Sequence, residues 1–384
     1  MKYMGSKRWM LRNGLGHLIQ DEIKTSNRFI DLFCGSGVVA QFAATSGHPI
    51  KVCAYDLQLF CAVLADSVIS RKTKLEPSNI WEDWHKGADH YLRAHRHHAG
   101  SLATLPAPSG FTQQFVEEMR NDCEKTAHFG LTSAYGGHYF SRAQALWLDA
   151  LRATLPDDRE KRSVALAALI QAASQCAASP GHTAQPFQPT RSAKQCLFEA
   201  WSREVKLDVQ TAMKRLCAVH AQIRGGAEVK DANAAAADLR AGDIVFIDPP
   251  YSSVHYSRFY HVLETVANGD LEAVSGIGRY PHLTRRPRSK YSVKTESATA
   301  LDELLKTVAE NGARALLTFP DHACSNGLSG DMVGATAAQY FKVSRRPVAN
   351  RFSTLGGTKD GAGVGYGRSA RQSASELIFI LTPR

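Results

Sequence analysis

The chain has 384 residues, of which 44% are hydrophobic and 21% charged, and its formal net charge is +10 with a pI near 9.2. This is globular composition for one large domain with insertions or for two domains, and no apolar stretch is long enough to cross a bilayer. The N-terminus has no signal-peptide h-region, and the eight cysteines form no CxxC or zinc-finger spacing. We therefore expect a reduced cytoplasmic protein with free thiols, and the basic balance permits nucleic acid as a partner.

The first elements alternate between strand and helix. Residues 29–39, "FIDLFCGSGVV", begin as an apolar strand and end in a glycine turn, and helical composition follows over 38–45. A second strand, "IKVCAYD" at 50–56, ends in an acid and precedes a helix-periodic segment at 57–72. This order predicts an α/β fold with a doubly wound, Rossmann-like sheet.

Helical patterns dominate the middle of the chain, and the sheet pattern then returns. The returning strands are expected at 227–231, 244–247 and 313–320, with a terminal antiparallel pair at 340–348 and 375–382. We therefore expect residues 1–105 and 226–384 to form the Rossmann-like catalytic and cofactor-binding domain. Residues 106–225 are expected to form a mainly α-helical insertion, a candidate target-recognition region.

The motif "DPPY" follows the apolar run Ile244–Ile247 directly. The run is typical of a strand buried on both faces. Pro249 and Pro250 have no backbone N–H, so the strand is expected to stop at Asp248. Ligands of open α/β sheets bind at the carboxyl ends of the strands, which makes Asp248 and Tyr251 candidate site residues.

A second candidate site lies in "DLFCGSG". Gly35 and Gly37 allow a sharp turn and a close approach of the backbone to a ligand. The GxG spacing alone fits a tight turn between strand and helix equally well. Asp56 ends the next strand, where an acid can bind a ribose diol, and the pair favours a nucleotide-type ligand.

Several segments together resemble one enzyme family. "KYMGSK" (2–7), "FIDLFCGSG", "GGHYFSRAQALWLDALR", "DPPY" and "PPYSSVHYSRFYHVLET" are similar to motifs of the D12-class, α-group N6-adenine DNA methyltransferases. The cofactor motifs come first, the catalytic motif last and a long insertion between, which is the α-group order. The resemblance implies a site-specific enzyme that moves a methyl group from S-adenosyl-L-methionine to a flipped-out adenine of double-stranded DNA. It also implies a cytoplasmic, nucleoid-associated protein of bacterial or phage type.

The resemblance also implies roles for individual residues. The Asp248 side chain and the Pro249 carbonyl would accept the two N6 hydrogens, and Tyr251 would stack on the base. Phe33 would lie near the methionine part of the cofactor, and Asp31 near its amino-acid end. The residues expected at the catalytic centre are Asp248, Pro249, Pro250 and Tyr251. The residues expected at the cofactor are Tyr3, Lys7, Asp31, Phe33, Gly35, Gly37, Asp56, Asp231 and Asp248.

Two basic segments, 279–294 and 350–372, suit either a solvated face or DNA phosphates, and a DNA substrate favours phosphate contact for at least one of them. The residues expected at DNA are Arg285, Arg286, Arg288, Lys290, Arg345, Arg346, Arg351 and Arg368. The histidine-rich run at 90–98 has no acid or cysteine to complete a ligand set, so we expect no metal site.

The sequence alone does not exclude functions other than adenine methylation. One is a methyltransferase that acts on RNA, on cytosine N4 or on a glutamine side chain, although the aspartate of "DPPY" disfavours glutamine. Another is a non-catalytic DNA-binding regulator on the same fold, which the intact "DPPY" and glycine loop disfavour. A monomer and a homodimer are equally compatible with the sequence.

Overall fold

The computed structural model describes residues 3, 5–99, 105–126, 128–270, 273–353 and 371–384. The chain divides by its contacts into two compact units. The helical unit comprises residues 1–3, 74–219 and 257–286, and the sheet unit comprises residues 4–73, 220–256 and 287–384. The helical unit thus begins well before residue 106 and takes in a segment that follows "DPPY".

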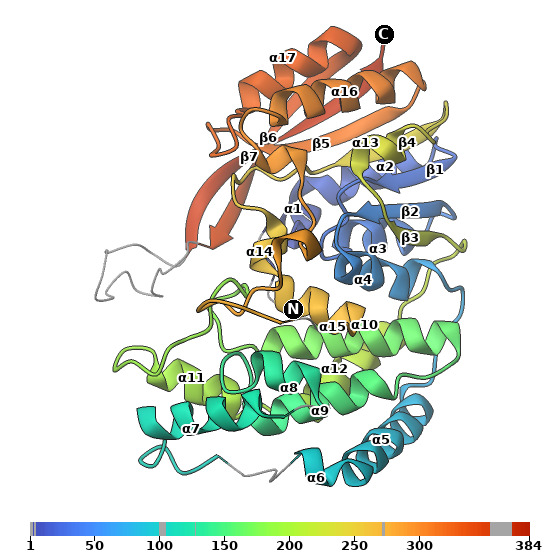
Figure 1. Cartoon of the computed structure of the whole chain (residues 1–384). Coiled ribbons are helices and arrows are strands. Elements are labelled where there is room, and N and C mark those ends of the chain that lie inside the picture. Colours follow the sequence, from blue (N-terminus) through green and yellow to red (C-terminus); the bar gives the residue numbers. More distant parts are fainter. Residues whose placement is uncertain (1–2, 4, 100–104, 127, 271–272, 354–370) are drawn as a thin grey trace. The chain divides into compact units, whose positions relative to one another are not determined.

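The sheet unit is built on seven strands in the order β3-β2-β1-β4-β5-β7-β6 (Figure 1). The pairs from β3 to β5 are parallel, and β7 pairs antiparallel with both β5 and β6. The strands are β1 (Arg28–Asp31), β2 (Lys51–Asp56), β3 (Gly226–Val229), β4 (Asp243–Ile247), β5 (Arg314–Pro320), β6 (Phe341–Ser353) and β7 (Arg371–Pro383). The predicted doubly wound α/β fold is confirmed, with its terminal antiparallel pair.

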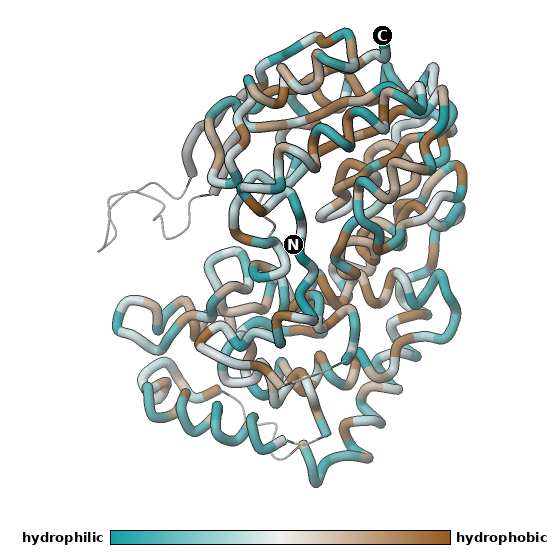
Figure 2. Tube along the Cα trace, turned by 45° about the horizontal axis from the view of Figure 1, so that its top comes forward, coloured by the Kyte–Doolittle hydropathy of each residue, from teal (hydrophilic) through white to brown (hydrophobic). Residues whose placement is uncertain are grey.

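Both faces of the central sheet are covered. All five residues of β4 are buried, as expected for an apolar strand without alternation. The last three helices of the unit contribute to one apolar core with β1, β4, β5 and β7, and Figure 2 shows hydrophobic residues along these strands. The helices of this unit are α1 (Arg8–Met10), α2 (Gly16–Ile23), α3 (Val38–Ala44), α4 (Leu59–Ile69), α13 (Ala232–Ala236), α16 (Ser297–Glu310) and α17 (Gly330–Tyr340). Short π- and 3-10 turns occupy Leu11–Leu15 and Lys290–Ser292.

The helical unit has its own core, which includes Phe111, Met119 and Trp201. Its helix α9 begins at a capping box, in which Ser141 and Gln144 satisfy each other's backbone N–H groups. The helices are α5 (Pro77–Ala94), α6 (Arg96–Ala99), α7 (Gln113–Glu124), α8 (Gly130–Tyr135), α9 (Arg142–Ala153), α10 (Arg159–Cys176), α11 (Lys194–Trp201), α12 (Val205–Cys217) and α15 (His261–Asn268), with a 3-10 turn at Leu283–Arg285. Helix α14 (Tyr256–Phe259) lies where the chain passes from the sheet unit to this one.

No helix within the described residues has both the length and the apolar character needed to traverse a bilayer.

Candidate active site at the carboxyl end of β4

The "DPPY" turn begins directly after β4, as the sequence predicts. Asp248 lies at the carboxyl end of the strand, and its side chain is 19% exposed. Its Oδ1 accepts hydrogen bonds from Lys7 Nζ and from Thr318 Oγ1 on β5, each at 2.8 Å. The Asp248 carboxylate is therefore fixed by one oxygen.

The second oxygen is available. Among the residues that the structure describes, none donates a hydrogen bond to Asp248 Oδ2 or to the carbonyl of Pro249. Pro249 and Pro250 cannot take part in the strand ladder, so these acceptors are not consumed by the sheet. Two acceptors are thus presented together at the end of β4, without a partner in the described part of the protein.

A buried lysine lies between two carboxylates. Lys7 is 3% exposed, and its Nζ is 2.8 Å from Asp248 and 3.1 Å from Glu376 Oε2 on β7. Burial alone would lower the pKa of Lys7, but the attraction of Asp248 and Glu376 outweighs burial and raises it. The two carboxylates therefore favour the charged form of the lysine, which both of them contact.

The pKa of Asp248 is raised above its ordinary value. Burial is the main cause and the charge of Glu376 adds to it, whereas Lys7 and the hydrogen bonds from Lys7 and Thr318 oppose the shift. A carboxylate in such surroundings is more basic than one in water, and so it is a stronger hydrogen-bond acceptor.

The turn itself is supported by the loop that follows β5. Asn326 Nδ2 donates to the carbonyl of Pro250 at 2.9 Å, and Ser325 Oγ accepts from the N–H of Ser253 at 2.9 Å. Tyr251 packs against the core of the sheet unit, and burial raises the pKa of its hydroxyl. The Tyr251 ring is held by these surroundings and does not lie in a free loop.

The glycine loop after β1 is closed by Asp56. Its Oδ2 accepts from the N–H of Gly35 at 2.9 Å, and its Oδ1 accepts from the N–H of Gln58 at 3.0 Å. Gly35 and Gly37 have φ of 49° and 72°, the left-handed region that favours glycine. Asp56 therefore fixes the loop, and each oxygen keeps a second lone pair for another donor.

We expect Gly37→Ala to destabilise the sheet unit and to weaken cofactor binding. A Cβ at Gly37 would lie 2.9 Å from both N and Cα of Ala65, which are backbone atoms that cannot yield. The matched control is Gly47→Ala, which has φ of 90° but nothing within 4 Å of its Cβ. Denaturant unfolding should show Gly37→Ala to be less stable than the control by about 1–3 kcal/mol. Equal stability of the two variants would contradict the close packing.

Asp31 has an unpaired buried oxygen beside this loop. The residue is 1% exposed, its Oδ1 accepts from the N–H of Phe33 at 3.3 Å, and its Oδ2 has no hydrogen-bond partner among the described residues. Burial raises the pKa of Asp31 well above its ordinary value, and the charges of Asp248 and Asp56 raise it further. A cationic ligand group at Oδ2 would satisfy this oxygen and favour the ionised form.

Aromatic rings lie on the same side of the sheet. Phe33 makes an edge contact with Tyr291 at 5.0 Å between ring centroids, and the Tyr291 hydroxyl donates to Asn233 Oδ1 at 2.7 Å. Asp231 accepts from two N–H groups of α13, at Asn233 and Ala234, and so caps that helix. Asp231 thus has a structural role whether or not it also contacts a ligand.

Tyr3 belongs to the helical unit, where it stacks on Tyr260 at 4.8 Å between centroids. The structure therefore brings Lys7, Asp31, Phe33, Gly35, Gly37, Asp56 and Asp248 together within the sheet unit, and it places Tyr3 in the other unit.

Arg286 is half-buried, whereas the other expected DNA-binding residues whose side chains the structure describes are exposed, and three of these pair with acids. Arg285 lies 3.7 Å from Asp270, Arg345 lies 2.9 Å from Asp331, and Arg288 lies 2.5 Å from Glu296. Exposed pairs of this kind contribute only about 0–1 kcal/mol, so a phosphate can replace the acid. Lys290 and Arg346 are exposed as well. Arg368 and the side chain of Arg351 lie outside the described part of the chain.

Sequence reasoning missed an aromatic and arginine cluster in the helical unit. The guanidinium groups of Arg258 and Arg286 lie over the ring of Tyr280, at 5.2 and 5.3 Å from its centroid. The Tyr280 hydroxyl donates to the carbonyl of Ala184. Tyr280 therefore contacts two cations that are far apart in the sequence.

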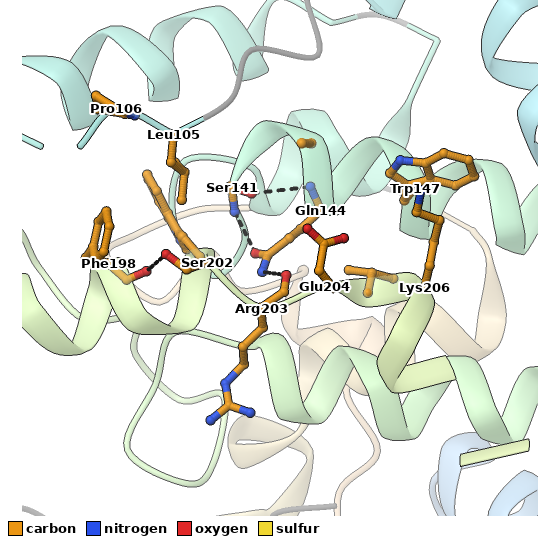
Figure 3. Close-up of a pocket in the computed structure, with 13 residues that line it drawn as sticks. Leu105, Pro106, Ser141, Gln144, Trp147, Phe198, Ser202, Arg203, Glu204 and Lys206 are labelled. Atoms are coloured by element: carbon orange, nitrogen blue, oxygen red, sulfur yellow. Dashed lines mark hydrogen bonds between the residues drawn. The ribbon is translucent and has the colours of Figure 1, made fainter. Parts of the chain in front are cut away.

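A cavity of about 420 Å³ lies within the helical unit (Figure 3). Gln144 joins its walls, since its side chain bonds the N–H of Ser141 at 3.0 Å and the carbonyl of Arg203 at 2.9 Å. Lys206 Nζ lies over the Trp147 ring at 4.6 Å. The cavity is lined by residues of α9, α11 and α12 and belongs to a different unit from the "DPPY" turn.

Comparison with known proteins decides the family. The model of the D12 class N6 adenine-specific DNA methyltransferases matches residues 3–313. The chain belongs to this family. It is a DNA methyltransferase, and adenine N6 as its target follows from the family.

Curated relatives agree with this assignment. The methyltransferase is 24% identical over 329 residues to the type II methyltransferase M.NlaIII of Neisseria lactamica, with 80% of each chain covered. It is 21% identical over 315 residues to the modification methylase LlaI of Lactococcus lactis subsp. lactis, which covers 80% of this chain and 44% of that protein. It is also 21% identical over 327 residues to the modification methylase StsI of Streptococcus sanguinis, with 83% and 44% covered. The chain thus spans less than half the length of the last two relatives.

Thr318, Asn326 and Glu376 are site residues that sequence reasoning missed. The sequence did contain a sign of the role of Glu376. It is the only acid in the apolar run "SELIFILT", which was predicted to be a strand. A charged side chain at a buried strand position needs a partner, and this residue could have been singled out on that ground. Thr318 and Asn326 had no comparable signal.

Proposed function

We propose that the protein is a site-specific adenine-N6 methyltransferase that uses S-adenosyl-L-methionine and acts on double-stranded DNA. The observation that carries the proposal is a pair of acceptors at the end of β4, Asp248 Oδ2 and the Pro249 carbonyl, to which no described residue donates a hydrogen bond. Adenine N6 carries two hydrogens, which is the number that two acceptors can bind.

The residues of the glycine loop suit the proposed methyl donor. Asp31 offers an unpaired buried oxygen to an ammonium group, and Asp56 keeps lone pairs for ribose hydroxyls. Gly35 and Gly37 present backbone without side chains, and Phe33 offers an apolar edge. S-adenosyl-L-methionine would supply an electrophilic methyl group on a sulfonium, and these residues would bind and orient it.

Asp248 and Pro249 would activate the acceptor. The lone pair of N6 is delocalised into the purine ring, so N6 is a poor nucleophile. Hydrogen bonds from both N6 hydrogens to Asp248 Oδ2 and to the Pro249 carbonyl draw this lone pair out of conjugation. Because Oδ1 is already fixed by Lys7 and Thr318, Oδ2 is aimed without further ordering.

The base has to leave the duplex to reach these groups. Tyr251 offers a ring on which the extruded adenine would stack, a contact worth about 1–3 kcal/mol. The helical unit and the arginines Arg285, Arg286 and Arg288 are proposed to contact the DNA phosphates. Target recognition by the helical region at 106–225 is part of this proposal.

The test is incubation of the protein with labelled S-adenosyl-L-methionine and duplex DNA, followed by digestion to nucleosides. We expect label in N6-methyl-2′-deoxyadenosine only. Label in N4-methyl-2′-deoxycytidine, or transfer to RNA in preference to DNA, would assign another acceptor. The absence of transfer to any nucleic acid, with DNA binding retained, would favour a non-catalytic regulator.

We expect Asp31→Asn to weaken cofactor binding by about 1–3 kcal/mol, because a buried charge-assisted contact is lost. In the wild type, binding should also weaken as the pH falls, because burial raises the pKa of Asp31 and the protonated acid cannot pair with a cation. Calorimetry across pH measures both effects. The control is Asp21→Asn at an exposed acid paired with Lys24. If cofactor binding to the wild type did not depend on pH, the assignment of Asp31 to the cofactor site would be wrong.

Replacing Arg285, Arg286 and Arg288 together by glutamine should reduce the salt dependence of DNA binding. Each phosphate contact that is lost lowers the slope of log K against log salt by about 0.9, so a fall of up to about three is expected. The control is Arg93→Gln, an exposed arginine of α5 that pairs with Asp89. An unchanged slope in the triple variant would assign the segment to a solvated face.

A further inference from the structure

Glu376 is an acid in a place where the fold does not require one. It lies on β7 at 5% exposure, and the three positions that follow it, Leu377, Ile378 and Phe379, are apolar core. Its Oε2 contacts Lys7 Nζ at 3.1 Å, and the same Nζ contacts Asp248 Oδ1 at 2.8 Å. Burying a carboxylate costs several kcal/mol, and a salt bridge with one lysine recovers only part of that cost.

The charges of Lys7 and Asp248 suggest a role for Glu376. A lysine bound to Asp248 alone forms a neutral pair, in which the lysine draws electron density from the carboxylate that has to bind the N6 hydrogens. With Glu376 present, the lysine is shared between two anions, and Asp248 keeps more of its negative charge. Glu376 also draws Lys7 Nζ toward β7, which fixes the direction from which Asp248 Oδ1 is held.

We infer that Glu376 is a positioning residue for methyl transfer: it holds Lys7 against Asp248 and offsets the lysine charge, so that Asp248 acts as a strong acceptor. The inference rests on the proposed role of Asp248. The other groups that face Asp248 are Thr318 from β5, Asp31 from β1 and the Tyr251 hydroxyl. Burial raises the pKa of Asp31 well above its ordinary value, and Asp31 has no direct contact with Lys7 among the described residues.

The experiment compares Glu376→Gln with the wild type in single-turnover methylation as a function of pH. The acid limb of the rate profile reports protonation of Asp248. Removal of a nearby negative charge lowers the pKa of Asp248, so the limb should move to lower pH by about one unit. The plateau rate should fall about tenfold because a weaker acceptor activates N6 less, while KM for DNA stays unchanged. Glu22→Gln, which removes the acid partner of Arg314 away from this site, is the matched control and should keep the wild-type profile.

A double variant separates positioning from a structural role. In a Lys7→Met background, Glu376→Gln should lower the plateau rate by clearly less than it does in the wild type, because the lysine that Glu376 holds against Asp248 is absent. Should Glu376→Gln be too unstable to assay, Glu376→Asp keeps the charge and should keep the wild-type acid limb at a lower plateau. An unmoved acid limb in Glu376→Gln, with a loss of rate that follows its loss of stability, would overturn the inference. Failure of the wild type itself to methylate adenine would instead refute the proposed function.

Discussion

Asp248→Ala should abolish methyl transfer while DNA and cofactor still bind. Asp248 Oδ2 is proposed to act mostly in the transition state, when the N6 lone pair localises, so its removal lowers kcat far more than it changes binding. We expect a loss of at least about a thousandfold, which is the upper range for a preorganised electrostatic contact. Single-turnover methylation, together with DNA and cofactor titrations, measures the separate effects.

Tyr251 provides the contrast to Asp248. Tyr251→Phe keeps the ring and should retain part of the activity, whereas Tyr251→Ala should lose most of it and weaken capture of the extruded base. A duplex with 2-aminopurine at the target reports extrusion as a rise in fluorescence. The rise should survive in Asp248→Ala and shrink in Tyr251→Ala. Substantial methylation by Asp248→Ala would reduce "DPPY" to a structural strand end.

Lys7→Met should be the most destabilising single change at the site. It leaves the carboxylates of Asp248 and Glu376 buried without their shared cation, and breaking a buried pair in this way costs about 3–5 kcal/mol. Loss of the lysine also raises the pKa of Asp248, so the acid limb of the rate profile should move to higher pH. This is the opposite direction to the shift expected for Glu376→Gln.

The stability of Lys7→Met should depend on pH with a definite sign. A carboxyl whose pKa is higher in the folded than in the unfolded state binds more protons when folded, so the variant should gain stability as the pH falls through that raised value. Denaturant midpoints between pH 5 and pH 8 measure this dependence. Lys24→Met, at an exposed lysine paired with Asp21, is the control and should stay close to the wild type. A Lys7→Met variant as stable as this control would show that the buried ion pairs do not stabilise the fold.

The sheet and the position of its site could be predicted from the sequence because short-range patterns determine them. The apolar run before "DPPY" and the glycine turn after β1 each mark a strand end, and the parallel pairing of β1 with β4 brings the two ends together. The partners of Asp248 could not be predicted in the same way. Thr318 and Glu376 lie on strands that reach the site only through tertiary pairing, and no local pattern in the sequence joins them to Lys7.

The division of the chain into two compact units also could not be predicted from local sequence patterns. Helical periodicity marks the insertion, but it does not tell which sheet-flanking segments pack with it. Residues 257–286 follow the catalytic turn in sequence and yet join the helical unit, where Arg279 donates to the carbonyls of Ala134 and Ser133 and pairs with Glu124 at 2.8 Å. These contacts decide where the segment packs, and they are formed between positions far apart in the chain.

The antiparallel insertion of β7 between β5 and β6 has a consequence for how activity is acquired during folding. Lys7 lies near one end of the described chain and Glu376 near the other. Lys7 can therefore contact both Asp248 and Glu376 only after β7 has paired with β5. The contact between Lys7 and Glu376 joins positions near the two ends of the described chain, and contacts of such long range are slow to form. A partly folded molecule can already hold the glycine loop, and with it a methyl donor, before its acceptor site is complete. In refolding, cofactor affinity should therefore return earlier than methylation.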